Sequence, residues 1–261
     1  MEKITTVKLQ TSKSKHQKIA MLTAYDYPFA RILDEAGVDI VLVGDSLGNV
    51  AMGYRNTLPV TMEEMVVHTR AVVQGVKRAL VVADMPFGSF QENDEKAVGN
   101  AITLVKAGAE AVKIEGVEYI SAIRKIIKAG IPVMGHIGFT PQAVNKRGPG
   151  TRGKETAERK RLLQEAKALE KAGCFAVVLE MVEAKLAQTL SKTLKIPMIG
   201  IGSGPHCDGQ VLVTQDLLGL SDWQPSFARP KVNLRTVVSR VIRQFIGEGC
   251  PCSSVDRAAV S

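Results

Sequence analysis

Short apolar runs alternate with amphipathic stretches along the chain from Ile19 onward. This alternation is typical of βαβ units, in which helices cover a parallel sheet that is buried on both faces. Eight apolar runs are candidate strands, at residues 19–23, 38–43, 79–83, 111–114, 131–135, 175–179, 197–201 and 211–214. The pattern therefore predicts an α/β protein with eight parallel strands.

The stretches between these runs place apolar residues three and four positions apart, which predicts helices. They cover residues 26–36, 61–77, 95–107, 117–129, 154–172 and 182–194. Four of them end in Ala-Gly, where glycine permits the positive φ angle that stops a helix; these are Gly37, Gly108, Gly130 and Gly173. We expect one single (β/α)8 TIM barrel over residues 1–246, with an N-terminal extension (1–18) and a C-terminal helix (232–245) closing the outer ring.

The bulk composition fits this fold and limits the location of the protein. A chain of 261 residues with 45% hydrophobic residues can bury a large core, although its length would also suit two small domains. No apolar run approaches the roughly 18 residues needed to cross a bilayer, and residues 1–18 lack the apolar centre of a signal peptide. We therefore expect a cytoplasmic protein that does not bind membranes.

The four cysteines are too few for a disulfide framework. Cys174 and Cys207 lie within or just after apolar runs, so we expect reduced, buried thiols. Cys250 and Cys252 belong to residues 247–261, a Gly/Ser-rich tail that is either a frayed natural end or an added segment.

The net charge of +8 raises the question of nucleic acid binding. The basic residues are spread along the chain, and few aromatic residues lie among them to stack on bases, so we expect no nucleic acid partner. The densest basic cluster covers residues 146–161. It is either a solvated loop and helix face or a means of attracting an anionic substrate.

Two acids follow neighbouring predicted strands, where the active-site side chains of such barrels stand. Asp45 follows the second run and Asp84 the third, so the two carboxylates should lie roughly 5 Å apart. Like charges at this distance require either a protonated carboxyl group or a cation between them, and oxygen ligands favour a hard ion such as Mg²⁺. The alternative is that each aspartate caps the helix that follows it.

The fourth run contains Lys113 and Glu115 on either side of Ile114, so both side chains should point to the same side of the strand. A charge pair inside a strand is costly unless it is paired or serves a ligand. Lys113 would therefore grip a substrate carboxylate, while Glu115 would bind the metal or orient a water on it. A structural salt bridge between them is the alternative.

Three further features follow the later runs. Glu180 closes the sixth run. A carboxylate at the end of such an apolar strand should have a raised pKa, which suits a general base. The alternative is that Glu180 merely begins the next helix. His136 would donate a hydrogen bond to substrate or to the backbone. The glycine-rich stretch from Gly200 to Gly204 would cradle a phosphate or simply form tight turns.

Six segments in this order make the chain, from Ile4 to Ile246, closely resemble the ketopantoate hydroxymethyltransferase family of the pantothenate pathway. They are Met-Leu-Thr-Ala-Tyr-Asp at 21–26, Val-Gly-Asp-Ser-Leu-Gly at 43–48, Ala-Asp-Met-Pro-Phe at 83–87, Val-Lys-Ile-Glu-Gly at 112–116, Gly-His-Ile-Gly at 135–138 with Thr-Pro-Gln at 140–142, and Gly-Ile-Gly-Ser-Gly at 200–204 with Asp-Gly-Gln at 208–210.

The resemblance implies transfer of the one-carbon unit of 5,10-methylenetetrahydrofolate to 3-methyl-2-oxobutanoate, which gives 2-dehydropantoate. By position, it implies that the carboxylates of Asp45 and Asp84 hold Mg²⁺ and also meet the substrate. It further implies that Glu115 lies at the metal's water shell and that Glu180 is the base. Ser46 and Lys113 would hold the keto acid by the same resemblance, and we count His136 with them as a candidate substrate-binding residue. The resemblance also implies a homo-oligomer, in this family a decamer of stacked rings.

One segment departs from the family. Where members usually have Gly-Gly-aromatic-Lys-Val-Gln-Gly after the Thr-Pro-Gln motif, residues 143–153 of this chain are shorter and lack the aromatic residue. Loops after barrel strands often act as lids, so we expect an effect on closure, folate contact or turnover.

Two rival functions remain at this point. One is a Mg²⁺-dependent lyase or decarboxylase that acts on 2-oxo acids in a related barrel. The other is a non-catalytic barrel that binds phosphate through residues 202–204.

Overall fold

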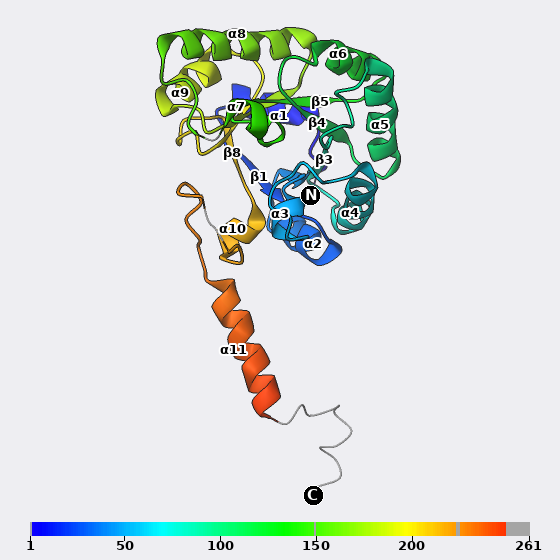
Figure 1. Ribbon diagram of the computed structural model, residues 1–261, viewed down its shortest axis with the longest axis vertical. Helices are drawn as coiled ribbons and strands as arrows, with labels where there is room; N and C mark the ends of the chain where they lie inside the picture. The colour runs from blue at the N-terminus through cyan, green and yellow to red at the C-terminus, as the bar shows by residue number, and fades with distance from the viewer. Residues whose placement is uncertain (1, 149, 223–224, 249–261) are drawn as a thin grey trace, which may run out of the picture. The chain divides into compact units, whose positions relative to one another are not determined.

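Eight parallel strands form a closed barrel in the computed structural model, which describes residues 2–148, 150–222 and 225–248 (Figure 1). The strands are β1 (Ile19–Thr23), β2 (Ile40–Val43), β3 (Leu80–Asp84), β4 (Ala111–Glu115), β5 (Val133–Gly138), β6 (Ala176–Glu180), β7 (Met198–Ile201) and β8 (Gly209–Leu212). Each strand pairs with the next, and β8 pairs with β1. The predicted (β/α)8 barrel is thereby confirmed.

Helices surround the strands, as Figure 1 shows for α4, α5, α6, α8 and α9. The first unit contains α1 (Thr6–Ser14), α2 (Tyr27–Glu35), α3 (Leu47–Val50), α4 (Met62–Gly75), α5 (Asp94–Lys106), α6 (Ile120–Lys128), the 3-10 turn η1 (Pro141–Ala143), α7 (Val144–Arg147), α8 (Thr156–Ala172) and α9 (Ala184–Thr193). The side chains of Asp26, Thr61 and Asn93 cap α2, α4 and α5. The four Ala-Gly stops are confirmed, because each glycine has a positive φ angle.

Several strands extend further than the apolar runs predicted. Asp84 and Glu180 are the last residues of β3 and β6, and His136 lies within β5, whereas the sequence placed all three after their strands. The reason is that backbone pairing continues beneath polar side chains: Asp84 pairs with Lys113, and Glu115 pairs with His136. β8 is shifted the other way, to residues 209–212 instead of 211–214, because Gly209 and Gln210 belong to the ladder although they are not apolar.

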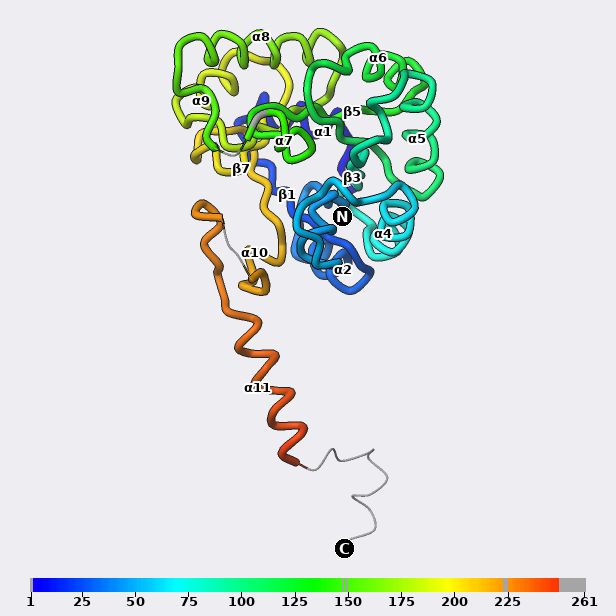
Figure 2. The backbone as a smooth tube through the Cα atoms, viewed as in Figure 1, coloured from blue at the N-terminus to red at the C-terminus, as the bar shows by residue number. Residues whose placement is uncertain are grey.

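The barrel interior is apolar at the amino ends of the strands. One buried cluster gathers the inward-facing side chains there, among them Met21, Ile40 and Met134. Ile4 and Leu9 of the N-terminal segment belong to the same cluster. The predicted extension therefore folds as α1 and packs against the barrel's amino end, while α4, α5, α6 and α8 follow one another around the outside (Figure 2).

A second compact unit begins at Thr214 and contains α10 (Thr214–Leu218) and α11 (Leu234–Gly247). α11 confirms the helix predicted at 232–245. Closure of the outer ring by this helix and the single domain over 1–246 both stay predictions. Of the predicted tail, 247–261, residues 249–261 lie outside the described residues, and Cys250 and Cys252 lie there with them.

Two of the expectations from composition can be compared with the structure. Cys174 and Cys207 are free and buried, as predicted, and burial raises the pKa of these thiols to about 12 and about 11. In the described part of the chain, no helix combines the length and the apolar character that crossing a membrane requires.

Candidate active site

Asp45 and Asp84 meet at the carboxyl end of the barrel, as predicted from their strands. The backbone N–H of Asp45 donates to Asp84 Oδ2 at 3.0 Å, and both residues are buried. Burial raises the pKa of Asp45 to about 8, and the negative charges of Asp84 and Glu115 contribute in the same direction. The side chain that caps α5 is that of Asn93, and α3 has no side-chain cap, so these aspartates do not serve as helix caps.

Lys113 points into the same cluster from β4. Its Nζ lies 2.5 Å from Asp84 Oδ1, and both side chains are almost completely buried. Burial by itself lowers the pKa of Lys113, but the carboxylates of Asp84, Glu115 and Asp45 outweigh this and raise it. The alternative interpretation, a structural salt bridge between Lys113 and Glu115, does not hold, since the ion pair joins Lys113 to Asp84 on the neighbouring strand. Lys113 is thus a buried cation held among carboxylates.

His136 lies between two carboxylates, a position that the sequence did not predict. Its Nδ1 is 3.2 Å from Glu115 Oε1 and its Nε2 is 3.2 Å from Glu180 Oε2. Neither contact has the alignment of a hydrogen bond, so both act mainly through charge. Although burial lowers the pKa of His136, the charge of Glu115 and contacts with Glu115 and Glu180 raise it to about 9. The residue is therefore an imidazolium at neutral pH.

Glu115 is held from two sides. Burial by itself raises its pKa, but the charge of His136 and further contacts lower it overall. Its Oε2 accepts from the backbone N–H of Gln142 at 3.0 Å. Glu115 is therefore an ionised carboxylate fixed beside the Asp45 and Asp84 pair.

Glu180 is the carboxylate of this cluster that is most open to solvent. Its side chain is 17% exposed, against 5% for Glu115 and 3% for Asp84. It does not begin the next helix, because Glu183 caps α9. Of the carboxylates in this cluster, Glu180 is therefore the one that a small molecule from solvent meets most easily.

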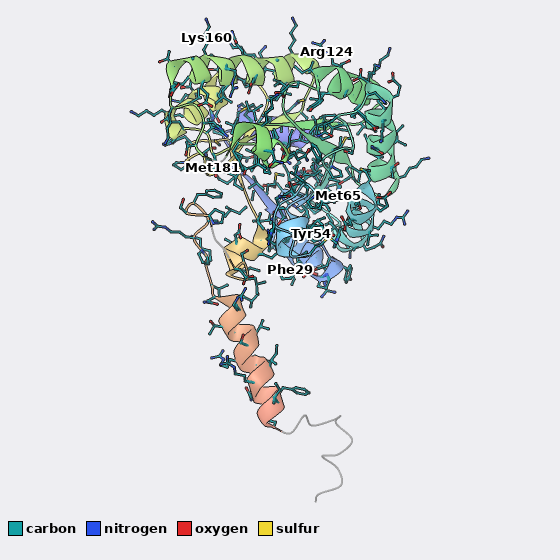
Figure 3. The ribbon with its side chains drawn as sticks, viewed as in Figure 1. Phe29, Tyr54, Met65, Arg124, Lys160 and Met181 are labelled. Atoms are coloured by element: carbon teal, nitrogen blue, oxygen red, sulfur yellow. The ribbon has the colours of Figure 1, made fainter. Side chains whose placement is uncertain are left out.

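The backbone around Glu180 is tightly constrained. A side chain at Gly138 of β5 would place its Cβ 2.2 Å from the carbonyl oxygen of Glu180, so only glycine fits beside it. The next residue, Met181 (labelled in Figure 3), has a φ angle of 50°, which is unusual for a residue other than glycine. Backbone strain of this kind often lies beside functional groups.

Ser46 follows Asp45 and meets a tyrosine. Its Oγ lies 2.8 Å from the hydroxyl oxygen of Tyr25, which is buried at the end of β1. Desolvation raises the pKa of Tyr25, so the phenol stays protonated. Tyr25 belongs to the first of the six sequence segments, but the pattern gave no reason to assign it to the site.

Gln142 is the other residue of the site that the sequence did not assign. Its Nε2 donates to Asp45 Oδ2 at 2.9 Å and to the backbone oxygen of Met85 at 3.0 Å. Only its place in the Thr-Pro-Gln segment pointed to it. The residue shows that the loop after β5 contributes to the same cluster.

The glycine-rich stretch at 200–204 serves the backbone in this structure. The hydroxyl of Ser203 donates to the oxygen of Leu179 at 2.7 Å and accepts from the N–H of Val182 at 2.9 Å. Gly202 and Gly204 have positive φ angles, as tight turns require. These contacts favour the tight-turn interpretation over a phosphate cradle.

The segment at 143–153 that departs from the family forms α7 and then runs beside residues 181–183. Arg152 forms an isolated parallel bridge with Val182, and its N–H donates to the oxygen of Met181 at 2.7 Å. The segment therefore supports the backbone that follows Glu180. Residue 149 lies outside the described residues.

Part of the basic cluster at 146–161 belongs to a solvated helix. Arg159 pairs with Glu183 at 2.7 Å, and Arg161 lies 3.5 Å from Glu165. Lys160 projects from the outer side of α8 (Figure 3). For these residues, the structure favours the helix-face interpretation.

A divalent cation has suitable oxygen ligands in this cluster. Among the described residues, no three or more His, Cys, Asp or Glu side chains are grouped so that they could together hold a metal ion. Mg²⁺ does not need such a group, because one or two carboxylates with waters and substrate oxygens complete its octahedron. Asp45 and Asp84 supply two carboxylates at the open end of the barrel, and their mutual repulsion is relieved by a cation. The residues present therefore fit Mg²⁺.

Comparison with known proteins gives consistent results. A family model described as ketopantoate hydroxymethyltransferase matches residues 3–249. A relative from Pyrococcus furiosus, named 3-methyl-2-oxobutanoate hydroxymethyltransferase, is 53% identical over 248 residues, which are 94% of this chain and 87% of the relative. A relative of the same name from Caldicellulosiruptor saccharolyticus is 51% identical over 251 residues, 95% of each chain.

Solved structures resemble the fold at low sequence identity. A putative phosphonomutase from Burkholderia cenocepacia has a TM-score of 0.68 at 14% identity, over 92% of this chain and 98% of its own. A phosphonopyruvate hydrolase in complex with oxalate and Mg++ has a TM-score of 0.65 at 13% identity, over 95% of this chain and 88% of its own. These likenesses concern the barrel architecture.

Proposed function

The chain belongs to the ketopantoate hydroxymethyltransferase family, and from this premise we propose that it transfers the one-carbon unit of 5,10-methylenetetrahydrofolate to 3-methyl-2-oxobutanoate, with Mg²⁺ bound by Asp45 and Asp84. The observation that carries the proposal is the buried pair of aspartates beside Lys113, with the accessible Glu180 at the same end of the barrel.

The substrate would be held by its two polar groups. Lys113 is a cation inside the barrel, so it attracts the carboxylate of the keto acid, and the Ser46 hydroxyl offers a hydrogen bond next to Asp45. The low dielectric of the buried site strengthens this attraction, whereas the Asp84 carboxylate, 2.5 Å from Lys113 Nζ, competes for the same ammonium group. The hydroxyl groups of Tyr25 and Ser46 share a hydrogen bond in which either can be the donor, and this contact holds Ser46 Oγ in place.

Glu180 would remove the proton from the carbon beside the keto group. His136 contacts one oxygen of Glu180, and the positive charge of its imidazolium keeps this carboxylate oriented. A bound Mg²⁺ would supply Lewis-acid stabilisation of the negative charge that develops on the keto oxygen. Glu115 supports this arrangement from the far side of His136, and as a buried acid it would orient water near Asp45 and Asp84.

The atoms balance as an aldol-type transfer. The proton lost from the substrate carbon passes to Glu180, and that carbon forms a bond with the methylene carbon of the folate. The two bonds between this methylene carbon and the folate nitrogens break, and water supplies the hydroxyl group of the new hydroxymethyl group. The remaining proton of this water and the proton taken up by Glu180 pass to the two folate nitrogens. The products are 2-dehydropantoate and tetrahydrofolate.

The test is an assay of 2-dehydropantoate formation with keto acid, methylenetetrahydrofolate and Mg²⁺. In Glu180→Gln, kcat should fall by about 10²- to 10⁴-fold, the usual contribution of a general base. Glu183→Gln is the matched control, because Glu183 lies three residues away and only caps α9 and pairs with Arg159. Full activity of Glu180→Gln would show that the base is a different group.

The rival functions predict different results. Cleavage of a carbon–carbon bond in a 2-oxo acid without folate would favour the lyase. A binding titration that shows phosphate affinity without any Mg²⁺ dependence would favour the non-catalytic barrel.

Asp84→Ala should weaken Mg²⁺ binding in a calorimetric titration. Unchanged Mg²⁺ affinity in this variant would reject the metal assignment.

We further propose that the chain is a homo-oligomer, as the family resemblance implies, and light scattering on the purified protein would measure its mass. A mass of one chain would reject this. The effect of the altered segment 143–153 on turnover and the cytoplasmic location stay predictions.

A further inference from the structure

We propose that Gln142 is a positioning residue of this site: its side-chain amide holds Asp45 in the orientation that binds the cation and substrate, and it thereby couples the loop after β5 to the aspartate pair. This inference depends on the proposed function. Its physical basis is a directional chain of hydrogen bonds that begins at a backbone N–H and ends at Asp45.

The contacts of Gln142 use the whole side-chain amide. The amide has two N–H donors and one oxygen acceptor. Its Nε2 donates to Asp45 Oδ2 and to the oxygen of Met85, and its Oε1 accepts from Nε2 of Gln91 at 3.2 Å. The side chain is buried, so no solvent molecule replaces a lost partner cheaply.

The direction of this chain is fixed by the backbone. Gln91 Oε1 accepts from the N–H of Gly88 at 2.7 Å, so the amide nitrogen of Gln91 must face Gln142. Gln142 must then present its oxygen to Gln91 and its nitrogen to Asp45. The reversed amide would set an oxygen against the Met85 carbonyl, which has no proton to donate.

The group that holds Asp45 is a neutral hydrogen-bond donor, the amide of Gln142. Lys113 already neutralises Asp84 at 2.5 Å, whereas Gln142 orients Asp45 without cancelling its charge. A second ammonium group at this position would compete with a bound cation. The amide therefore restrains one oxygen of Asp45 without adding a positive charge that would compete with a bound cation.

The backbone of Gln142 makes a second hydrogen bond to an acid of the site. Its N–H donates to Glu115 Oε2 at 3.0 Å, so the turn η1 contacts both Asp45, which follows β2, and Glu115 of β4. This bond persists whatever side chain stands at position 142. Substitution of the side chain consequently tests the contact with Asp45 separately from the contact with Glu115.

The decisive variant is Gln142→Met, which keeps the length of the side chain and removes its donors. We expect the Kd for Mg²⁺, measured by calorimetry in the absence of substrates, to rise by about 10- to 100-fold, the usual effect of losing a group that orients a metal ligand. The increase in Tm caused by a fixed Mg²⁺ concentration should shrink accordingly. The kcat/KM for the keto acid should fall in parallel.

Two further variants make the result specific. Gln91→Met removes only the group that fixes the direction of the Gln142 amide, so it should weaken Mg²⁺ binding in the same sense but by less. Gln210→Met is the control, because Gln210 Nε2 donates to the oxygen of Gly204 and not to an acid of the site. We expect its Mg²⁺ Kd to match that of the wild type.

A purely structural role for Gln142 would lower the Tm of the metal-free Gln142→Met variant but leave its Mg²⁺ Kd and kcat/KM within twofold of wild type, and this result would overturn the inference. Should Gln142→Met not fold, unchanged Mg²⁺ affinity and kcat/KM in Gln91→Met would overturn it as well. A wild type that turns over without Mg²⁺ would instead reject the metal assignment. In that case a reduced kcat/KM in Gln142→Met would still support the positioning role, and an unchanged one would not.

Discussion

The two ends of the barrel interior are built from the same strands and have opposite character. At the amino ends, the inward-facing positions hold side chains such as Leu80, Ala111 and Met134, closed off by Leu9 of α1. Two residues further along, β3 still has an apolar residue, whereas β4 and β5 have Lys113 and His136. After another two residues, β3 and β4 carry Asp84 and Glu115. His136 and Lys113 complete the charged end.

This difference shows how one fold separates stability from chemistry. Apolar burial at the amino end stabilises the barrel without any requirement for partners. The carboxyl end buries carboxylates and cations, which are costly unless each is paired, and so it lowers stability in return for binding and proton transfer. Substitutions at the two ends should therefore have separable effects on folding and on activity.

The largest effect should come from Lys113→Met at the charged end. The change leaves Asp84 without its ion-pair partner, which costs about 3–5 kcal/mol of unfolding free energy, and it removes the proposed substrate cation, which should lower kcat/KM by about 100-fold or more. Urea denaturation and steady-state kinetics measure the two losses. Lys125→Met is the control, since Lys125 pairs with Asp94 and Glu95 at the surface. Normal activity of Lys113→Met would contradict its role.

The corresponding change at the apolar end is Leu9→Ala. Leu9 is 1% exposed, so the cavity should cost about 2–5 kcal/mol of unfolding free energy. Because Leu9 lies at the opposite end from Glu180, kcat should stay as in the wild type wherever the variant is folded. Val7→Ala on the same helix is the control, because Val7 is 68% exposed. A loss of kcat in folded Leu9→Ala would show that the two ends are coupled.

A pH-dependent contribution to stability is expected just before β3. The buried carboxylate of Asp34 accepts from the backbone N–H groups of Lys77, Arg78 and Ala79. Burial by itself raises the pKa of Asp34, but these three hydrogen bonds outweigh it, so the pKa is lowered overall. The stabilisation is therefore complete above the unfolded pKa of 3.8 and is lost as the pH falls through the lower folded value.

Asp34→Asn should accordingly lower the unfolding free energy by about 1–3 kcal/mol at pH 7. The difference from wild type should shrink as the pH is lowered below 3.8. Urea denaturation over a pH series measures it. A difference that stays constant down to the lowest pH at which both proteins fold would show that the ionised carboxylate is not the cause.

The smallest effect should come from two residues with positive φ angles, one near each end. Met181 has a φ angle of 50° and His16 one of 54°. Replacement of either by glycine relieves strain and should raise the unfolding free energy by up to about 1 kcal/mol, since the flexibility of glycine offsets part of the gain. Only Met181→Gly should also lower kcat/KM, because Met181 follows Glu180. Equal kinetics for both variants would indicate that the strain at Met181 has no catalytic role.

The sequence was a good guide where one strong local signal dominated. Every predicted strand and helix exists, because alternating burial leaves a clear pattern in a barrel of parallel strands. The strand ends were less well predicted: polar residues such as Asp84 and Glu180 stopped the apolar run but not the backbone ladder. α1 was missed because Leu9 is its single buried residue, which gives no apolar pattern at helical spacing.

The residues of the candidate site also differ in how well the sequence predicted them. Asp45, Asp84 and Lys113 were predicted to converge from strand order and side-chain alternation, and their contacts in the structure agree with this. Gln142 and Tyr25 were assigned no role, because a neutral amide or phenol in a loop has no distinctive spacing. The placement of His136 between Glu115 and Glu180 also depends on the lateral register of three strands.

The sequence by itself determined the barrel and the set of acids and bases at the strand ends, since both follow from local periodicity. Only the tertiary structure decided which charges pair. Lys113 could have met Glu115 on its own strand, but the register places it beside Asp84, where the ion pair forms. Pairing is set by distances of a few ångströms between strands far apart in the chain, and Coulomb energies at low dielectric change steeply over such distances.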